Sequence, residues 1–203
     1  MEKEFWNERY GQEEFVYGIH PNEYLKEKLQ DLPKGKILFA AEGEGRNSVY
    51  AAKLGWNSYA FDQSEAGKTK AILLAEKNEV EIDYIICGAD EIDYPENSFD
   101  ALALIYAHFP GEFRREFHQK LAKFLKPGGV LILEGFSKNQ EKIQRENPKA
   151  GGPRLPEMLW DLEELKKDFE GFECMESVET EIELDEGNYH KGLGAVVRIF
   201  AKK

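Results

Sequence analysis

The fold of this chain is constrained most strongly by one pattern, in which a strand, a turn with two glycines, a helix and a second strand follow one another. The apolar run 36–41 leads into a turn that holds Gly43 and Gly45, and a helical pattern follows. A second apolar run at residues 59–61 ends on Asp62, seventeen residues after Gly45. This order predicts a turn and an acid at one edge of a parallel sheet, the place where nucleoside cofactors bind. Glycines let the backbone approach a ligand closely, and the acid offers oxygens to both ribose hydroxyls.

The composition indicates one globular domain, which we expect to span residues 1–203. Hydrophobic residues make up 41% of the chain and charged residues 33%, the profile of a folded soluble protein with a core rather than a disordered one. The formal net charge is −12. Such a field repels phosphate backbones, so we expect no nucleic-acid partner.

The sequence predicts neither a membrane segment nor a metal site. Residues 1–4 do not begin a secretory signal, and no apolar run approaches the ~20 residues that span a bilayer, so we expect a cytoplasmic protein with no membrane partner. Cys87 and Cys174 are too few for a disulfide framework or a zinc site, and we expect both to be buried thiols. The four histidines lack metal-ligand spacing, which predicts no metal.

Strands and helices alternate along most of the chain. The run 101–106 is apolar throughout, which is typical of a strand buried on both faces of a parallel sheet. We expect strands at residues 36–41, 58–61, 83–87, 101–106, 130–134, 172–181 and 194–201, and helices at residues 23–29, 46–53, 66–77, 111–124 and 162–169. The last two strands are close in sequence, which favours an antiparallel pair.

These elements predict an α/β fold. We expect a doubly wound, mostly parallel seven-stranded sheet with helices on both faces and an antiparallel last strand. Its ligand site should lie at the carboxyl ends of the strands. Asn22 and Ser64 are expected to cap the helices that follow them.

Five segments in matching order and spacing resemble the class I S-adenosylmethionine (SAM)-dependent methyltransferases, which have a Rossmann-like fold. These segments are residues 41–47, 61–64, 89–91, 95–100 and 125–129. More narrowly, residues 5–22 and 107–114 resemble the branch that includes tellurite-resistance and thiopurine methyltransferases. In that branch the N-terminal segment covers the cofactor, so the resemblance implies a helical cover at residues 1–34.

The resemblance implies SAM as cofactor and S-adenosylhomocysteine (SAH) as product. The implied cofactor-binding residues are Trp6, Arg9, Ala41, Glu42, Gly43, Gly45, Asn47, Asp62, Gln63, Ala89, Asp90 and Tyr106. Asp62 would bind the ribose hydroxyls, Asp90 or its neighbour Glu91 the adenine amino group, and Tyr106 would line the floor near the sulfonium. Arg9 or Arg46 would meet the cofactor carboxylate.

Other positions in the glycine turn depart from the family pattern. Many members carry an acid at the position of Phe39 and a glycine at the position of Ala41. Glu42 is expected to stand in for the acid from the turn itself, and Ala41 is expected to keep a negative φ.

His108 is the candidate general base, because it follows the fourth strand and its ordinary pKa suits proton transfer near neutrality. A packing role is the alternative. His190 with Tyr189 is a candidate for the edge of the substrate pocket. Residues 137–160, which include Trp160, form either a substrate lid or a surface loop whose apolar end packs under the sheet.

The sequence therefore favours a SAM-dependent methyltransferase that acts on a small-molecule acceptor, as a monomer or homodimer. Phe39 and Ala41 keep open a non-catalytic SAM- or SAH-binding protein. An NAD-dependent oxidoreductase is a further alternative, although Ser48 stands where a dinucleotide fingerprint has its third glycine.

Overall fold

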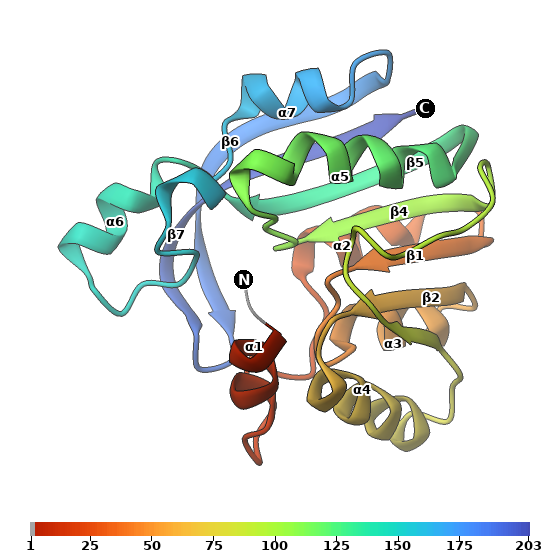
Figure 1. Cartoon of the computed structure of the whole chain (residues 1–203), viewed down its shortest axis with the longest axis horizontal. Helices are drawn as coiled ribbons and strands as arrows, with labels where there is room; N and C mark the ends of the chain where they lie inside the picture. The colour runs from red at the N-terminus through yellow and green to blue at the C-terminus, as the bar shows by residue number, and fades with distance from the viewer. Residues whose placement is uncertain (1–2) are drawn as a thin grey trace.

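The computed structural model describes residues 3–203 and shows one mixed seven-stranded sheet (Figure 1). The strand order is β3-β2-β1-β4-β5-β7-β6, and β7 runs antiparallel to both of its neighbours while the first five strands are parallel. The strands are β1 (Lys36–Ala40), β2 (Asn57–Asp62), β3 (Asp83–Ile86), β4 (Phe99–Ile105), β5 (Leu125–Phe136), β6 (Glu173–Glu186) and β7 (His190–Lys202). The predicted fold class is confirmed. Residues 1–2 of the expected N-terminal cover lie outside the described residues.

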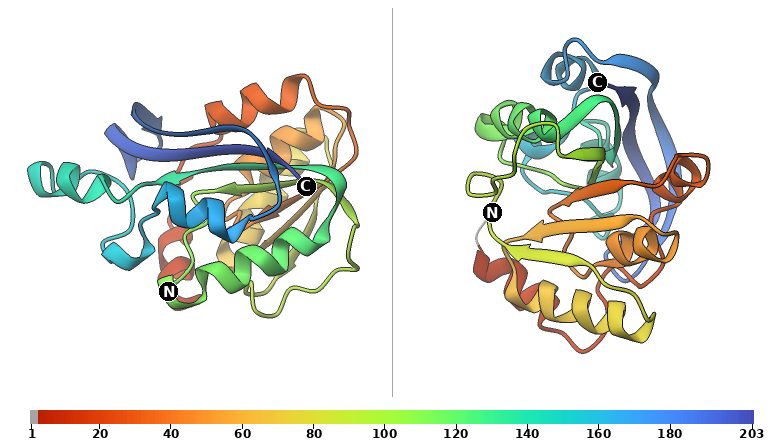
Figure 2. Two further views of the ribbon diagram at one scale, coloured as in Figure 1. Left: turned by 90° about the horizontal axis from the view of Figure 1, so that it is seen from above. Right: turned by 90° about the vertical axis from the view of Figure 1, so that its right-hand side faces the viewer.

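Helices cover both faces of the sheet, as Figure 2 shows from above. They are α1 (Lys3–Tyr10), α2 (Glu23–Gln30), α3 (Arg46–Lys53), α4 (Glu65–Lys77), α5 (Gly111–Phe124), α6 (Gln140–Glu146) and α7 (Leu162–Asp168), with a short 3₁₀ helix at Pro156–Met158. Asn22 and Ser64 accept from Leu25 and Gly67 amides, which confirms both predicted caps.

The side chains of β4 alternate between two apolar cores. Leu102 and Leu104 belong to the core under α5 and α7. Ala101 and Ala103 belong to the core that α2, α3 and α4 cover. Both faces of a central parallel strand are therefore buried, which explains the continuous apolar run at residues 101–106.

The last two strands are longer than the sequence predicted. We expected about ten residues between them, but β6 continues to Glu186 and β7 begins at His190. The additional length carries the hairpin tip to the N-terminal segment, where the Asn188 amide donates to the Val16 carbonyl oxygen at 3.0 Å. Figure 1 shows the tip beside α1. Contacts far apart in sequence thus support the end of this hairpin.

Two further predictions are tested by burial and helix length. Cys174 is exposed on the edge strand β6 and Cys87 is partly buried, so the expectation of two buried thiols was wrong. None of the helices within residues 3–203 is long and apolar enough to cross a membrane.

We predict that two left-handed glycines differ in their tolerance of alanine. Gly45 (φ 83°) has Ala71 Cβ 2.5 Å from the place of its missing Cβ, whereas Gly55 (φ 91°) has no atom within 4 Å. Gly55→Ala should lower the free energy of unfolding by about 1–2 kcal/mol, the cost of the left-handed backbone. Gly45→Ala should lower it by a further ~1–3 kcal/mol through overpacking. Urea denaturation measures both, and equal losses would contradict the packing role of Gly45.

Candidate functional site

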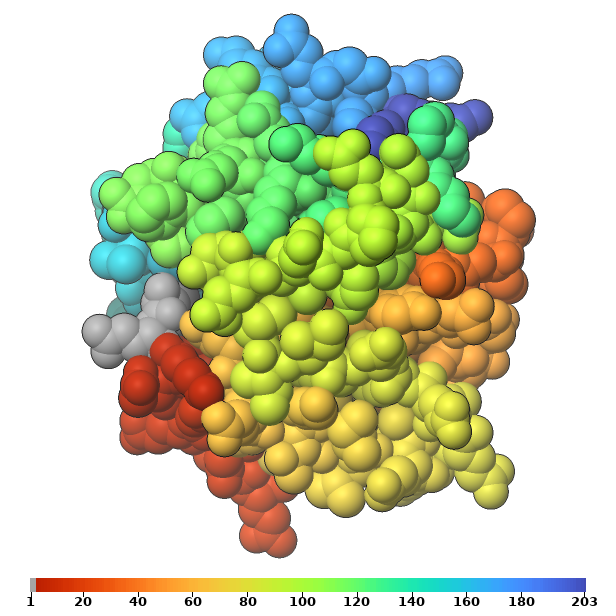
Figure 3. Space-filling view, turned by 45° about the vertical axis from the view of Figure 1, so that its right-hand side comes forward, coloured from red at the N-terminus to blue at the C-terminus, as the bar shows by residue number. Residues whose placement is uncertain are grey.

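A cavity of about 670 Å³ lies at the carboxyl ends of β1, β2 and β4. Its size is within the range of small-molecule sites. The N-terminal segment, the β6–β7 tip and residues 149–155 line it as well. On the outside, α1 lies against α4 (Figure 3), where Lys3 pairs with Glu65 at 2.7 Å and Asn7 accepts from the Ser64 hydroxyl at 2.8 Å.

The structure brings most of the predicted site residues together around this cavity. Those that line it are Trp6, Arg9, Ala41, Glu42, Asn47, Asp62, Gln63, Ala89, Asp90, Tyr106 and His108. Tyr189 and His190 also line it, as expected for the pocket edge. Gly43 and Gly45 are absent from the lining, and of the two acids considered for adenine, only Asp90 contributes to it.

The two glycines of the turn leave space for two neighbouring helices. A Cβ at Gly43 would lie 2.5 Å from the Tyr10 hydroxyl of α1, and one at Gly45 would lie 2.5 Å from Ala71 of α4. Both glycines have positive φ. The glycines let α1 and α4 pack against the turn. Their expected contact with the cofactor stays a prediction.

Ala41 has φ 51°, so the expectation of a negative φ was wrong. The turn imposes this left-handed conformation, which costs alanine more strain energy than it would cost glycine. The Glu42 amide that follows donates to the Phe61 carbonyl oxygen of β2 at 3.1 Å, which fixes the turn to the sheet.

Glu42 holds the beginning of α3. Its Oε1 accepts from the Asn47 amide at 3.0 Å and from the Ser48 amide at 2.6 Å. Burial raises the pKa of this carboxyl to about 7, although the amide bonds act in the opposite direction. The Glu42 carboxylate thus satisfies two backbone amides at the beginning of α3.

Asp62 joins the end of β2 to both neighbouring loops. Its Oδ2 accepts from the Gly43 amide at 3.1 Å, and its Oδ1 accepts from the Ser64 amide at 2.8 Å. Burial raises the pKa of Asp62 to about 6 against these hydrogen bonds. The carboxylate lines the cavity and is fixed in place before any ligand arrives.

The two candidate arginines have different surroundings. Arg46 pairs with Glu186 at 2.9 Å and donates to the His20 carbonyl oxygen. Arg9 instead lies over the Tyr189 ring, 4.4 Å from its centroid, and donates to the Tyr17 hydroxyl at 3.2 Å. Within residues 3–203, Arg9 forms no ion pair with a carboxylate, so its charge is available to an anionic ligand group.

His108 does not have the free nitrogen that a general base needs. Its Nδ1 lies 2.8 Å from the Met158 carbonyl oxygen, and its Nε2 accepts from the Phe136 amide at 3.0 Å. A neutral ring that donates through Nδ1 satisfies both contacts. Burial lowers the pKa of His108 to about 3. We therefore correct the candidate base to a residue that fixes the loop at Met158 to the end of β5.

The segment 137–160 contains both of the arrangements considered from sequence. Trp160 is fully buried beneath β5, where a Cβ at Gly135 would meet its ring, so it anchors the segment. Residues 149–155 instead form part of the cavity wall. The helix α6, which precedes both parts, was not predicted, because its apolar positions are few.

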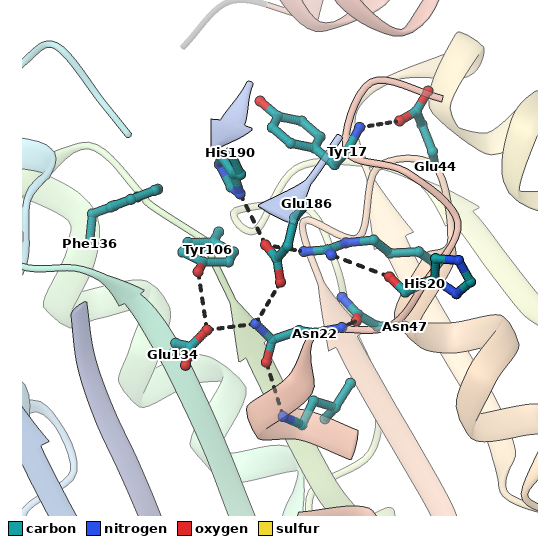
Figure 4. A network of polar contacts seen from close by, with 12 residues as sticks. Tyr17, His20, Asn22, Glu44, Asn47, Tyr106, Glu134, Phe136, Glu186 and His190 are labelled. Carbon is teal, nitrogen blue, oxygen red and sulfur yellow. Dashed lines mark hydrogen bonds and ion pairs between the residues drawn. The ribbon is translucent and has the colours of Figure 1, made fainter. Parts of the chain in front are cut away.

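A buried polar network lies beside the cavity and was not predicted from the sequence (Figure 4). The Asn22 side-chain amide donates to Glu134 at 2.5 Å and to Glu186 at 3.0 Å. The Tyr106 hydroxyl donates to Glu134 at 3.1 Å, and Arg198 pairs with the same carboxylate. The only sequence signal was an acid at the end of an apolar strand, since Glu134 follows the run 130–133.

We predict that Glu42 makes the protein less stable as the pH rises. The folded-state pKa of about 7 exceeds the ordinary value of 4.5, so the stability from this group is complete below pH 4.5 and is lost as the pH rises through 7. Glu42→Gln keeps the acceptor oxygen and removes the titration. Between pH 4.5 and 8 the variant should gain roughly 3 kcal/mol relative to the wild type. Urea unfolding at several pH values measures this, with the exposed Glu81→Gln as control; parallel curves would contradict it.

Comparisons with known proteins relate this chain to methyltransferases. Residues 38–133 match a family described as "Methyltransferase domain". A ubiquinone biosynthesis O-methyltransferase from Rickettsia typhi is 24% identical over 123 residues, which are 59% of this chain and 50% of the relative. The chain thus spans about half the length of that curated relative.

Solved structures share the fold over nearly the whole chain. TehB from Haemophilus influenzae superposes with a TM-score of 0.72 and 17% identity, covering 99% of this chain and 66% of TehB. Magnesium protoporphyrin IX methyltransferase from Synechocystis, with bound SAH, gives a TM-score of 0.71 and 15% identity, covering 99% and 97%. At such identities the likeness concerns the fold alone.

Proposed function

We propose that this chain, in which residues 38–133 are a SAM-dependent methyltransferase domain, transfers the methyl group of SAM to a small-molecule acceptor. One observation carries the proposal. A single cavity joins a polar part, with Asp62 and Asp90, to an aromatic part, with Tyr106, Phe136 and His190. A cofactor and an apolar acceptor therefore have adjoining compartments.

The polar part suits the nucleoside and amino-acid portions of SAM. Asp62 presents a buried carboxylate to ribose hydroxyls, and the exposed Asp90 offers its carboxylate to the adenine amino group. Arg46 is paired with Glu186, whereas Arg9 has no carboxylate partner among the described residues, which fits Arg9 to the cofactor carboxylate. When bound, SAM supplies a methyl group on a sulfonium, and these residues would hold and orient it.

The aromatic part suits a small acceptor better than a polymer. Rings of Tyr17, Tyr106, Phe136 and His190 crowd together, with Tyr106 and Phe136 centroids 4.9 Å apart. The net charge of −12 opposes the approach of nucleic acid. An aromatic compartment limits the access of water to the reacting atoms, which favours displacement at the methyl carbon.

The N-terminal segment supports a relation to the tellurite-resistance and thiopurine branch. Trp6 and Arg9 form part of the cavity wall, and Glu44 of the turn accepts from the Val16 amide at 2.8 Å. These contacts favour a cover over the cofactor that is formed by α1 and the residues after it, whereas α2 packs on the face of the sheet. We assign the whole described chain to one domain, with residues 149–155 as the part of the 137–160 segment that meets the acceptor.

We predict that Asp62→Ala weakens SAH binding by roughly 1–3 kcal/mol, the scale of a charge-assisted hydrogen bond. Isothermal titration calorimetry measures the affinity, and the free energy of unfolding must be measured in parallel because Asp62 also holds the Gly43 and Ser64 amides. Asp83→Ala, on the neighbouring strand, is the matched control. Unchanged affinity in a folded Asp62→Ala protein would contradict the ribose role.

We further expect SAH to bind in the micromolar range or tighter and NAD not to bind. Incubation with SAM and a panel of small hydroxyl, thiol and amine acceptors should then release SAH with some of them. Binding of SAH without methyl transfer to any acceptor would support a non-catalytic binding protein instead. Binding of NAD alone would support an oxidoreductase.

A further inference from the structure

His190 has the free ring nitrogen that His108 lacks. It begins β7 and lines the cavity, and its Nδ1 lies 3.2 Å from a Glu186 carboxylate oxygen. Within residues 3–203, no protein atom forms a hydrogen bond with its Nε2. A neutral ring that donates through Nδ1 to Glu186 keeps the Nε2 lone pair available as an acceptor.

The ring is held within the aromatic part of the cavity. Its centroid lies 4.5 Å from that of Tyr106, 4.5 Å from that of Tyr17 and 5.1 Å from that of Phe136. Tyr106 follows β4, whose carboxyl end borders the cofactor part of the cavity. His190 therefore lies where the acceptor part adjoins the cofactor part.

We propose that His190, oriented by Glu186, is the general base that accepts the proton of an acceptor hydroxyl carried on an aromatic or apolar body. The inference rests on the proposed methyl transfer and names the acceptor class for the same site. The acceptor oxygen forms its bond to the methyl carbon as the carbon–sulfur bond breaks, and that electron pair remains on sulfur. The hydroxyl proton passes to Nε2 of His190.

The chemistry explains why a base is needed for this acceptor class. A phenolic hydroxyl such as that of tyrosine has an ordinary pKa of ~10 and arrives protonated at neutral pH. A positioned base contributes about 10²- to 10⁴-fold to such a proton transfer. An ionised thiolate needs no such help, which gives the test its contrast.

Burial keeps His190 neutral, and the hydrogen bond to Glu186 orients its ring. Glu186 of the same hairpin stabilises the cationic ring, whereas burial and the cations Arg46 of α3 and Arg9 of α1 act against it; burial dominates and lowers the pKa of His190. Tyr17 and Tyr106 contact its faces. A neutral imidazole at pH 7 is the form that accepts a proton.

The test compares His190→Gln with the wild type, using two acceptors and SAM. Phenol is protonated at neutral pH, and 4-nitrothiophenol is ionised. The variant should lose about 10²- to 10⁴-fold in kcat with phenol. It should lose less than about 10-fold with 4-nitrothiophenol. His20→Gln, which changes an exposed histidine, is the matched control and should lose nothing.

A binding readout completes the test without turnover. In complex with SAH, the wild type should bind phenol about 2- to 10-fold more tightly than anisole, which has no hydroxyl to donate. His190→Gln should lose this preference while SAH affinity is unchanged. Equal losses with both acceptors, an unchanged phenol rate, or no preference for phenol over anisole in the wild type would overturn the proposal. Failure to bind SAH at all would instead overturn the proposed function.

Discussion

The buried carboxylate of Glu186 holds together the parts of the chain that form the cavity. It pairs with Arg46 at the beginning of α3, accepts from Asn22 before α2, and accepts from Nδ1 of His190 on β7. Burial would raise the pKa of Glu186, but Arg46 and His190 outweigh burial and hold it at about 2. Removal of one partner from such a buried pair costs about 3–5 kcal/mol, because the other charge is left without compensation. One carboxylate therefore joins the hairpin, the N-terminal segment and the beginning of α3.

That connection explains why the cavity wall combines segments far apart in sequence. The turn between β1 and α3 supplies Glu42 to the α3 amides and Glu44 to the Val16 amide, so the same few residues fix a helix and the N-terminal segment. Gly43 and Gly45 leave space for Tyr10 and Ala71. A turn that is commonly discussed through its ligand contacts is here equally a packing centre for α1 and α4.

The sequence predicted those features that local patterns determine. Apolar runs that alternate with helical patterns predicted the strands, and Asn22 and Ser64 predicted where two helices begin. Asp62 lies in the cavity wall as expected. The β6–β7 tip could not be predicted from its acid-rich pattern, because distant contacts stabilise it: Glu186 accepts from Asn22, and Asn188 donates to Val16. The φ of Ala41 was wrong for the same reason, since the sheet and the turn together impose it.

The two histidines in the cavity wall show why residue type and position do not determine a chemical role. The partly buried His108 and the buried His190 both lie near Phe136, with ring centroids 6.0 Å and 5.1 Å from it. Backbone groups occupy both ring nitrogens of His108, so this ring joins the Met158 loop to β5 and has no nitrogen left to accept a proton. The carboxylate beside His190 uses one nitrogen and fixes the direction of the other. Hydrogen-bond partners, which only the folded chain supplies, therefore separate a ring that supports the site from a ring equipped to accept a proton within it.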